Sequence, residues 1–158
     1  MADIVDVQTR SRMMAGIRAR DTRPEMLLRK ALHARGYRYR LCDKRLPGKP
    51  DMVFPRFRAV IFVHGCFWHG HEACRLFRLP KSNTAFWQGK IAANVARDRV
   101  VLDSLAAAGW RVMVVWECAL KGKKMFEALP ETIKFIESWL NGGGSFTEVG
   151  SSVLPDSD

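Results

Sequence analysis

Four residues have the types and the spacing of metal ligands: Cys66, His71, Cys74 and Cys118. The first three fall in the pattern C-x4-H-x2-C, and the fourth follows an apolar run farther along the chain. Three thiolates and one imidazole form a tetrahedral ligand set of structural zinc. We therefore predict a zinc site here, and a core thiol at Cys42, the remaining cysteine. Two alternatives stay open: isolated buried thiols beside a loop histidine, and a Cys66 nucleophile paired with His64 or His69.

A second set of residues could cut a phosphodiester. Asp51 follows the turn segment 46–50 (LPGKP) and begins a predicted strand. A Pro-Asp pair followed by a second apolar strand is the arrangement of the PD-(D/E)xK nuclease core, in which the Asp helps to hold Mg²⁺ against a phosphate. The pair alone is weak support, because most Pro-Asp pairs are turns. The next predicted strand, 59–63, also lacks the Glu-x-Lys of that core.

Because the lysine of that core is absent, a histidine could act as the base instead. Three of the four histidines fall within eight residues: His64, His69 and His71. An imidazole titrates near neutral pH and can take a proton from an attacking water. If His71 binds zinc, two remain for chemistry. The alternative is that all three are loop or metal-binding residues.

One carboxylate falls on an apolar stripe. The segment 84–109 predicts a long helix whose apolar positions are Trp87, Ile91, Val95, Leu102 and Leu105. Asp98 lies in the middle of this stripe at about 100° per residue. A carboxylate that faces a core is costly unless it is paired, hydrogen-bonded or near a metal. We interpret Asp98 as a functional residue, and a structural salt bridge to Arg97 or Arg99 is the alternative.

Aromatic residues accompany the histidines. Phe67 and Trp68 lie inside the Cys/His-rich segment, and Trp87 lies at the start of the long helix. Exposed rings stack on bases for about 1–3 kcal/mol each, and wedging into a base step costs least at a mispair. These rings could therefore contact DNA at a weak base pair. Without the metals nearby, Phe67 and Trp68 would fit a core equally well.

Periodicity places these residues on an α/β framework. A capping box of Thr22 and Glu25 predicts a helix that Gly36 ends. Strands are predicted at 37–41, 51–54, 59–63 and 110–116, and further helices at 84–109 and 125–140. The segment 64–83 has no period, and a loop of this length is usually functional. We expect a mixed β-sheet flanked by helices.

The chain divides into three parts by composition. Residues 1–20 are rich in arginine and predict an arm that binds DNA. Residues 21–140 would form one endonuclease domain. Residues 141–158 begin with a glycine-rich stretch and continue with polar residues, which is typical of a disordered tail.

Charge and composition narrow the class of partner. Lysine and arginine outnumber aspartate and glutamate by 26 to 16, and the formal net charge is +10. Such a field favours nucleic acid, although a merely soluble basic protein is the alternative. No apolar stretch is long enough for a membrane span, and the N-terminus lacks the pattern of a secretory signal. We therefore expect a cytoplasmic protein with reduced thiols.

Several segments together resemble a known family. They are TRSRMMAGIRARDT (9–22), LPGKPDMVF (46–54), VIFVHGCFWHGH (60–71), the FW..KI..NV.RD pattern of 86–98, and GWRVMVVWECAL (109–120). In this order they are similar to the very short patch repair (Vsr) DNA mismatch endonucleases, over about residues 1–140. The resemblance implies a PD-(D/E)xK-like nuclease core with a structural zinc site. It also implies that the enzyme nicks one strand 5′ to the mismatched thymine of a T·G pair left by deamination of 5-methylcytosine.

The resemblance also assigns chemical roles by position. Asp51 would bind catalytic Mg²⁺, assisted by the backbone carbonyl of Val63, and His69 would activate water. Three residues would be supporting active-site groups: His64, Glu25 and Asp98. The chain departs from the family pattern at position 63, where Thr is usual, so a role for that side chain would be lost while a carbonyl ligand would not.

Further assignments concern zinc and DNA. The zinc ligands would be Cys66, His71, Cys74 and Cys118. The loop HGHEAC is one residue longer than the family's pattern, which puts the position of Cys74 in question. The major-groove contacts would be Phe67, Trp68 and Trp87. The minor-groove contacts of the arm would be Met14 and Ile17.

Two other classes of protein fit part of this pattern: a non-catalytic zinc-containing DNA-binding module and a restriction enzyme on the same core. The first accounts for charge, loop and rings, but not for Asp98 together with Asp51 and His69. The resemblance further implies double-stranded DNA with a T·G mismatch as substrate, and contacts with mismatch-repair and repair-synthesis proteins. It also implies a monomer that acts at the nucleoid in the bacterial cytoplasm.

Overall fold

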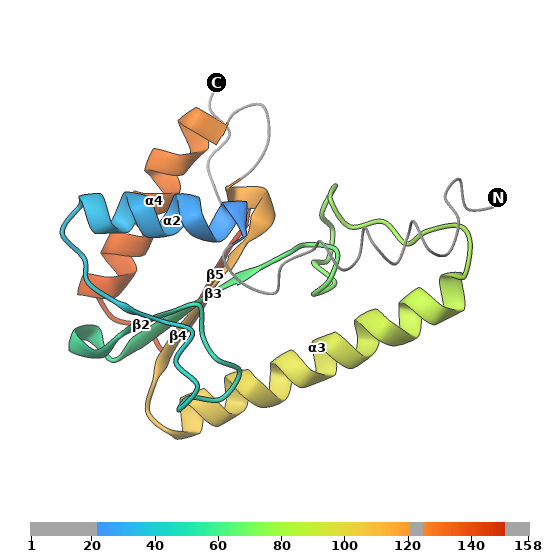
Figure 1. Cartoon of the computed structure of the whole chain (residues 1–158), viewed down its shortest axis with the longest axis horizontal. Helices are drawn as coiled ribbons and strands as arrows, with labels where there is room; N and C mark the ends of the chain where they lie inside the picture. Colours follow the sequence, from blue (N-terminus) through green and yellow to red (C-terminus); the bar gives the residue numbers. More distant parts are fainter. Residues whose placement is uncertain (1–21, 121–124, 151–158) are drawn as a thin grey trace.

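The computed structural model describes residues 22–120 and 125–150, which form a five-stranded sheet with helices on both faces (Figure 1). The main elements follow one another as α2 (Arg23–Ala34), β1 (Arg40–Leu41), β2 (Met52–Phe54), β3 (Ala59–His64), α3 (Thr84–Ala107), β4 (Arg111–Trp116), α4 (Met125–Asn141) and β5 (Phe146–Val149). Short 3-10 helices follow β2 at Pro55–Phe57 and β4 at Glu117–Ala119. The predicted α/β class is confirmed.

The sheet is mixed, as predicted. Its strands lie in the order β1-β2-β3-β4-β5, and the pairs β1–β2 and β2–β3 are antiparallel. β3 and β4 are parallel along their whole length, and β5 is parallel to β4. Parallel neighbours need a crossover, which the loop 65–83 and α3 supply. The carboxyl ends of β3 and β4 therefore lie side by side at one edge of the sheet.

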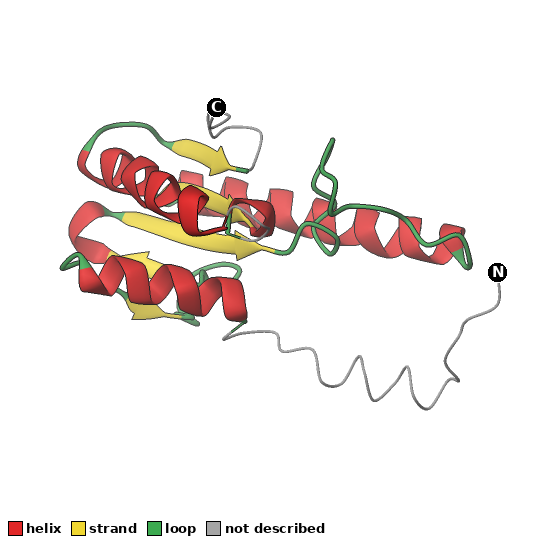
Figure 2. Ribbon diagram, turned by 90° about the horizontal axis from the view of Figure 1, so that it is seen from above, coloured by secondary structure: helices red, strands yellow, loops and turns green. Residues whose placement is uncertain are grey.

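Successive side chains of a strand point to opposite faces of the sheet, so the core has two layers. α2 and α4 cover one face, where they pack against Phe54, Ile61 and their neighbours. α3 covers the other face, where Leu105 packs with Val60 and Phe62. Figure 2 shows α3 on the opposite side of the sheet from α2 and α4. Because β3 and β4 are covered on both faces, nearly all their residues are buried, as strands in a parallel pair require.

The N-terminus of α2 forms as the capping box predicts. Thr22 Oγ1 accepts a hydrogen bond from the Glu25 backbone N–H at 3.4 Å, and Pro24 occupies the first turn. The helix ends at Ala34, and Gly36 follows with a φ of +94°, which glycine adopts without steric cost. This start places Glu25 in the first turn, where it is buried.

The core-facing stripe predicted for α3 holds only in part, and the bounds of the helix are close to those predicted. Of its five residues only Ile91 and Leu105 are buried, and Val95 is 45% exposed. The C-terminal part of α3 lies against the sheet, whereas its N-terminal part continues beyond the sheet beside the loop 65–83 (Figures 1 and 2). A helix that runs past its sheet lacks the neighbour that would bury a complete stripe.

The predicted tail is also wrong over its first part. Residues 146–149 form β5, the last strand of the sheet, and Val149 is fully buried. The glycine-rich stretch before it is a turn, in which Gly144 has a φ of +117° and its carbonyl accepts a hydrogen bond from Arg111 Nε at 2.9 Å. Glycine here provides the turn back to the sheet rather than a linker. Residues 151–158 lie outside the described residues.

The strand predicted at 37–41 is shorter in the structure, where β1 contains only Arg40 and Leu41. Tyr37 and Tyr39 instead pack their rings against Phe54 from β2. The predicted arm, 1–20, with its contacts Met14 and Ile17, lies outside the described residues. Among the helices that the structure describes, we find none with the length and apolar character that crossing a bilayer requires.

Candidate active site and zinc site

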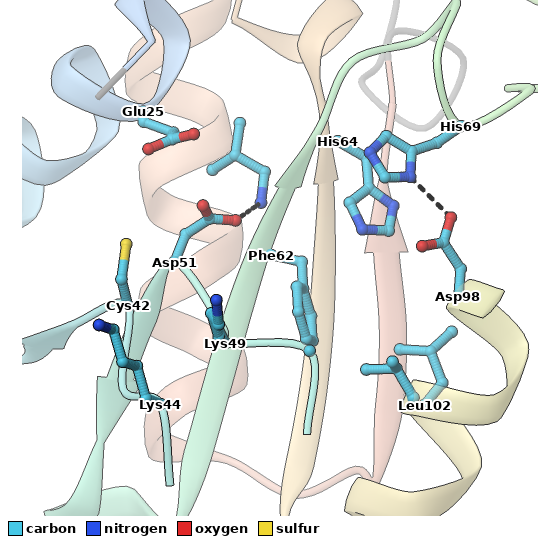
Figure 3. Close-up of a pocket in the computed structure, with 13 residues that line it drawn as sticks. Glu25, Cys42, Lys44, Lys49, Asp51, Phe62, His64, His69, Asp98 and Leu102 are labelled. Carbon is cyan, nitrogen blue, oxygen red and sulfur yellow. Dashed lines mark hydrogen bonds and ion pairs between the residues drawn. The ribbon is translucent and has the colours of Figure 1, made fainter. Parts of the chain in front are cut away.

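The start of β2 and the end of β3 border a cavity of about 360 Å³ (Figure 3). Its walls contain all five residues that the resemblance assigned to catalysis: Glu25, Asp51, His64, His69 and Asp98. Glu25 and Asp51 lie on one side of the cavity, and the two histidines and Asp98 lie on the other (Figure 3). The Asp51 carboxylate and the His69 imidazole therefore face the same space, as the prediction that both act on one phosphate requires.

Strand pairing fixes the position of Asp51. β2 is antiparallel to β3, with Met52 opposite Ile61, so the residue before β2 lies beside the end of β3. The Asp51 carboxylate accepts a hydrogen bond from the Val63 backbone N–H at 2.7 Å. A side chain held by a backbone amide in the middle of the sheet is rigid, as a metal ligand should be.

Glu25 approaches Asp51 from the first turn of α2. Glu25 is only 3% exposed and accepts a hydrogen bond from Arg29 Nη2 at 2.9 Å. Burial raises the pKa of Asp51 to about 7, with a further contribution from Glu25, while the Val63 N–H acts in the opposite direction. Two carboxyl groups in such a site favour a proton or a cation between them. Their oxygens are the ligands that Mg²⁺ prefers, so this donor set fits a magnesium ion.

The opposite wall contains a histidine bonded to a carboxylate. His69 Nδ1 lies 2.6 Å from Asp98 Oδ2, a contact between the loop 65–83 and the middle of α3. The alternative partners predicted for Asp98, Arg97 and Arg99, do not bond it, and Arg99 instead faces Asp103 at 3.8 Å. With Nδ1 bonded to the carboxylate, Nε2 of His69 keeps a lone pair that can accept a proton.

His64 stacks on His69, with ring centroids 3.8 Å apart and planes 4° from parallel. Burial, with a smaller effect of His69, lowers the pKa of His64 to about 3, so His64 is neutral near pH 7. Ligand atoms of His64, His69 and Asp98 are close enough for an ion. However, the lone pairs of two stacked rings lie in parallel planes, and one ion cannot lie in both. We therefore interpret this group as a positioned base rather than a metal site.

The four predicted zinc ligands are brought together by the fold. Donor atoms of Cys66, His71, Cys74 and Cys118 all lie within 4.8 Å of one another. Tetrahedral zinc with bonds of about 2.3 Å to sulfur separates its ligands by about 3.8 Å, so the cluster fits this ion. His71 Nδ1 lies 3.6 Å from Cys118 Sγ, and the His71 ring stacks on Trp116 at 4.1 Å. The extra residue in the loop does not displace Cys74 from the group.

The backbone between the two sites is held against α3. Gly70 has a φ of +62°, and a Cβ at this position would lie 2.9 Å from Ile91 Cγ2, so only glycine allows this close approach. Asn94 Nδ2 donates a hydrogen bond to the Trp68 carbonyl at 2.9 Å. The irregular loop thus contacts α3 on one side and carries the Cys/His cluster on the other.

The predicted DNA-contacting rings form one cluster at the part of α3 that extends beyond the sheet. Phe67, Trp68 and Trp87 contact one another edge-on, with centroids 5.2–5.9 Å apart. All three are partly exposed, and none belongs to either core layer. Lys90 lies over the Trp68 ring at 5.6 Å. The alternative that Phe67 and Trp68 are core residues is therefore wrong.

Sequence reasoning missed three residues that line the cavity: Cys42, Lys44 and Lys49. Cys42 is not the core thiol that we predicted; it is partly exposed and has a φ of +46°. Lys49 has the same left-handed backbone, with a φ of +47°. The one signal that could have revealed Lys49 is its place in the turn before Asp51.

Fold and site together define a class. A mixed sheet with a carboxylate at the start of β2, anchored to the end of β3, and with a base across one cavity, is an α/β nuclease of the PD-(D/E)xK type. The comparisons with known proteins specify the family. The model of the family described as DNA mismatch endonuclease Vsr matches residues 2–75.

Relatives extend this match along the chain. The DNA mismatch endonuclease Vsr of Escherichia coli is 46% identical over 156 residues, which cover 98% of this chain and 97% of that protein. The type II nicking enzyme V.XorIIP of Xanthomonas oryzae pv. oryzae is 52% identical over 81% of this chain and 93% of its own. The type II nicking enzyme V.NmeAIP of Neisseria meningitidis is 48% identical over 78% and 87%. The chain belongs to the Vsr family of DNA mismatch endonucleases.

Proposed function

We propose that this protein is a Mg²⁺-dependent endonuclease that nicks one strand of duplex DNA 5′ to the mismatched thymine of a T·G pair. Cutting there would begin very short patch repair of deaminated 5-methylcytosine. The observation that carries the proposal is the cavity in which Asp51 and the His69–Asp98 pair face each other. The family, and the words mismatch and nicking in its members' names, support the same activity.

In this proposal, the residues divide the work of hydrolysis. Asp98 holds His69 by Nδ1, so that Nε2 accepts a proton from the water that attacks phosphorus. The new bond to the water oxygen forms as one phosphorus–oxygen bond of the backbone breaks. His64 packs flat against His69 and limits rotation of its ring.

Asp51, with the carbonyl of Val63, would hold Mg²⁺, which supplies positive charge to the phosphate oxygens when bound. Asp51 is prepared for this role by the Val63 N–H, which fixes one carboxylate oxygen, and by Glu25, which adds a second negative group. Valine at position 63 offers no hydroxyl, so only its backbone can contribute.

We propose that the Cys66–His71–Cys74–Cys118 cluster binds one structural Zn²⁺. Deprotonated thiolates are required for this, and in the metal-free protein hydrogen bonding to Cys118 and burial raise the pKa of Cys66. Bound zinc would hold the loop that positions His69 and the rings of Phe67 and Trp68. Those rings would wedge into the duplex at the weakly stacked mispair.

Other proposals concern assembly and location. We propose that the protein acts as a monomer at the nucleoid of the bacterial cytoplasm, where its DNA substrate lies. Mismatch-repair and repair-synthesis proteins would act at the same lesion after the nick. The sedimentation behaviour of the purified protein tests the monomer directly.

The proposal is tested with two duplexes, one fully paired and one with a single T·G mismatch, each with and without Mg²⁺. We expect one nick, in the thymine strand, on the mismatched duplex with Mg²⁺ alone. Asp51→Ala should reduce nicking to a trace and leave mismatch binding largely intact. A non-catalytic module would bind without cutting, and a restriction-type enzyme would cut the paired duplex as well. Either result would reject the proposed function.

A further inference from the structure

The turn before Asp51 has an unusual backbone. Gly48 and Lys49 are consecutive residues with left-handed conformations, with φ of +72° and +47°. Glycine adopts this region freely, but lysine rarely does, and a residue before proline ordinarily prefers extended backbone. Non-glycine residues held in such conformations cluster at functional sites.

Contacts on both sides hold the turn in this shape. A Cβ on Gly48 would lie 2.5 Å from Val101 Cγ1, so the turn rests directly on α3. Pro50 is buried, and Asp51 is tied to the Val63 backbone. Lys49 lies between these fixed points, so its backbone is held at the edge of the cavity.

The turn places Lys49 on the wall that also contains Asp51. Figure 3 shows Lys49 beneath Asp51 on the same side of the cavity, and Lys44 farther out with its amine directed away. Among residues 22–120 and 125–150, no ion pair joins Lys49 to a carboxylate. Its ammonium is therefore available to an anion that enters the cavity.

The strand that would carry the lysine of the PD-(D/E)xK core has none. β3 ends in Val63 and His64, and the histidines on the opposite wall supply a base but no permanent positive charge. Glu25, Asp51 and Asp98 bring three carboxyl groups to the lining, and each carboxylate repels a phosphate. A fixed cation beside Asp51 would offset this repulsion at the reacting group.

We propose that Lys49 is a catalytic residue of the nicking reaction, whose ammonium contacts a non-bridging oxygen of the scissile phosphate. From the turn before β2 it does the work of the lysine that β3 lacks. This inference rests on the proposed function. Charge builds on the phosphate oxygens as water attacks, so the contact strengthens in the transition state and acts on the rate more than on binding.

The test compares four variants of the zinc-loaded protein on the T·G duplex. Lys49→Met keeps the length of the side chain without its charge, and Lys49→Gly also removes the backbone strain. Lys49→Arg keeps the charge, and Lys134→Met removes a similar charge from the exposed surface of α4, outside the cavity. Single-turnover nicking is measured at saturating Mg²⁺, duplex binding without Mg²⁺, and thermal unfolding for each protein.

We expect Lys49→Met and Lys49→Gly to nick about 100-fold more slowly, the usual loss when one donor to a developing anion is removed. Duplex binding by these two variants should change by less than about threefold. Lys49→Arg should nick at least about tenfold faster than Lys49→Met. Lys134→Met should stay within about threefold of the unaltered protein. Lys49→Gly should unfold at or above the unaltered temperature, because glycine relieves the strain. Its slow nicking would then reflect lost chemistry rather than lost structure.

Two results would overturn the assignment. One is nicking by Lys49→Met or Lys49→Gly within about threefold of the unaltered protein, and the other is a loss that appears wholly in duplex binding. Either result leaves the proposed function standing, because the unaltered protein still nicks. If the unaltered protein does not nick at all, the proposed function fails, and the role of Lys49 fails with it.

Discussion

His69 and His71 are separated by one residue, yet they belong to chemically different sites. His69 bonds a carboxylate of α3 at 2.6 Å and stacks on His64 at the cavity. His71 approaches a thiol at 3.6 Å and stacks on Trp116 in the cysteine cluster. Gly70, in a left-handed conformation, lies between them. One short loop thus contains a reactive half and a structural half.

This difference shows how a loop without regular structure can position a base. The structural half offers soft sulfur ligands, which suit zinc, and in the proposed function a bound ion would stabilise the loop. The reactive half contains the His69 imidazole, which the Asp98 carboxylate holds, and it faces Asp51 across the cavity. Because the two halves use different chemistry, a substitution in the reactive half should leave the structural half intact, whereas loss of the structural half should also disturb the base that it positions.

The largest expected effect comes from removing a zinc ligand. Cys118→Ser should eliminate bound zinc and reduce the free energy of unfolding by about 3 kcal/mol or more, with loss of nicking, because the loop loses its anchor. Metal analysis and denaturant unfolding measure both effects. Cys42→Ser is the matched control, since Cys42 lies outside the cluster, and it should keep one zinc per chain. If Cys118→Ser keeps its zinc and its stability, the cysteine cluster is not a structural zinc site.

A smaller but still large effect is expected from Asp98→Asn. The amide cannot hold His69 in the same protonation state, so single-turnover nicking should fall on the order of 100-fold or more. Zinc content and unfolding temperature should stay unchanged, which separates this variant from Cys118→Ser. Asp103→Asn, which alters an exposed carboxylate on the same helix, should nick normally. An unchanged rate in Asp98→Asn would show that the histidine needs no partner.

Trp68→Ala should affect recognition and not chemistry. Loss of its ring should weaken the preference for the mismatched duplex by about 1–3 kcal/mol, the usual contribution of one stacking ring. The salt dependence of binding reports neutralised phosphates, at a slope of about −0.9 for each, and should hardly change. Binding to both duplexes over a range of salt measures the two quantities together. A large drop in the slope would mean that this part of the loop contacts phosphates instead.

The smallest expected effect is on the free energy of unfolding, which should depend on pH through the Asp51 carboxyl. The pKa of Asp51 is raised from 3.8 to about 7, so its share of stability is complete below pH 4 and is lost as pH rises through 7. Asp51→Asn has no charge to lose and can still accept the Val63 N–H. Without Mg²⁺ it should exceed the unaltered protein in unfolding free energy by on the order of 1–2 kcal/mol at pH 8, and match it near pH 4. Urea unfolding at both pH values tests this, and a reversed difference at pH 8 would contradict it.

Residue types and spacing could predict much of the site. Four sulfur and nitrogen ligands in one pattern predicted a cluster that the fold does assemble, and a carboxylate in an apolar stripe marked Asp98. Asp98 is at the cavity, although only two of the five stripe residues are buried. The argument from burial therefore reached the correct residue through a helix that only partly covers the sheet.

Features that depend on three-dimensional approach could not be predicted. Lys49 and Cys42 reach the cavity through left-handed backbone in turns, which no periodicity reveals. β5 was missed because a glycine-rich stretch has the composition of a linker, whereas here it returns the chain to β4. The partner of Asp98 was also missed, since a neighbour in sequence, Arg97 or Arg99, is the default expectation on a helix.

The central claim is that Asp51 and His69 act together on a single phosphodiester. Single-turnover nicking of the T·G duplex by Asp51→Ala, His69→Ala and the double variant tests it most directly. Groups that serve one step are not additive, so the double variant should be no more than about tenfold slower than the slower single variant. Rate losses that multiply, or substantial nicking by Asp51→Ala, would show that the two residues act independently.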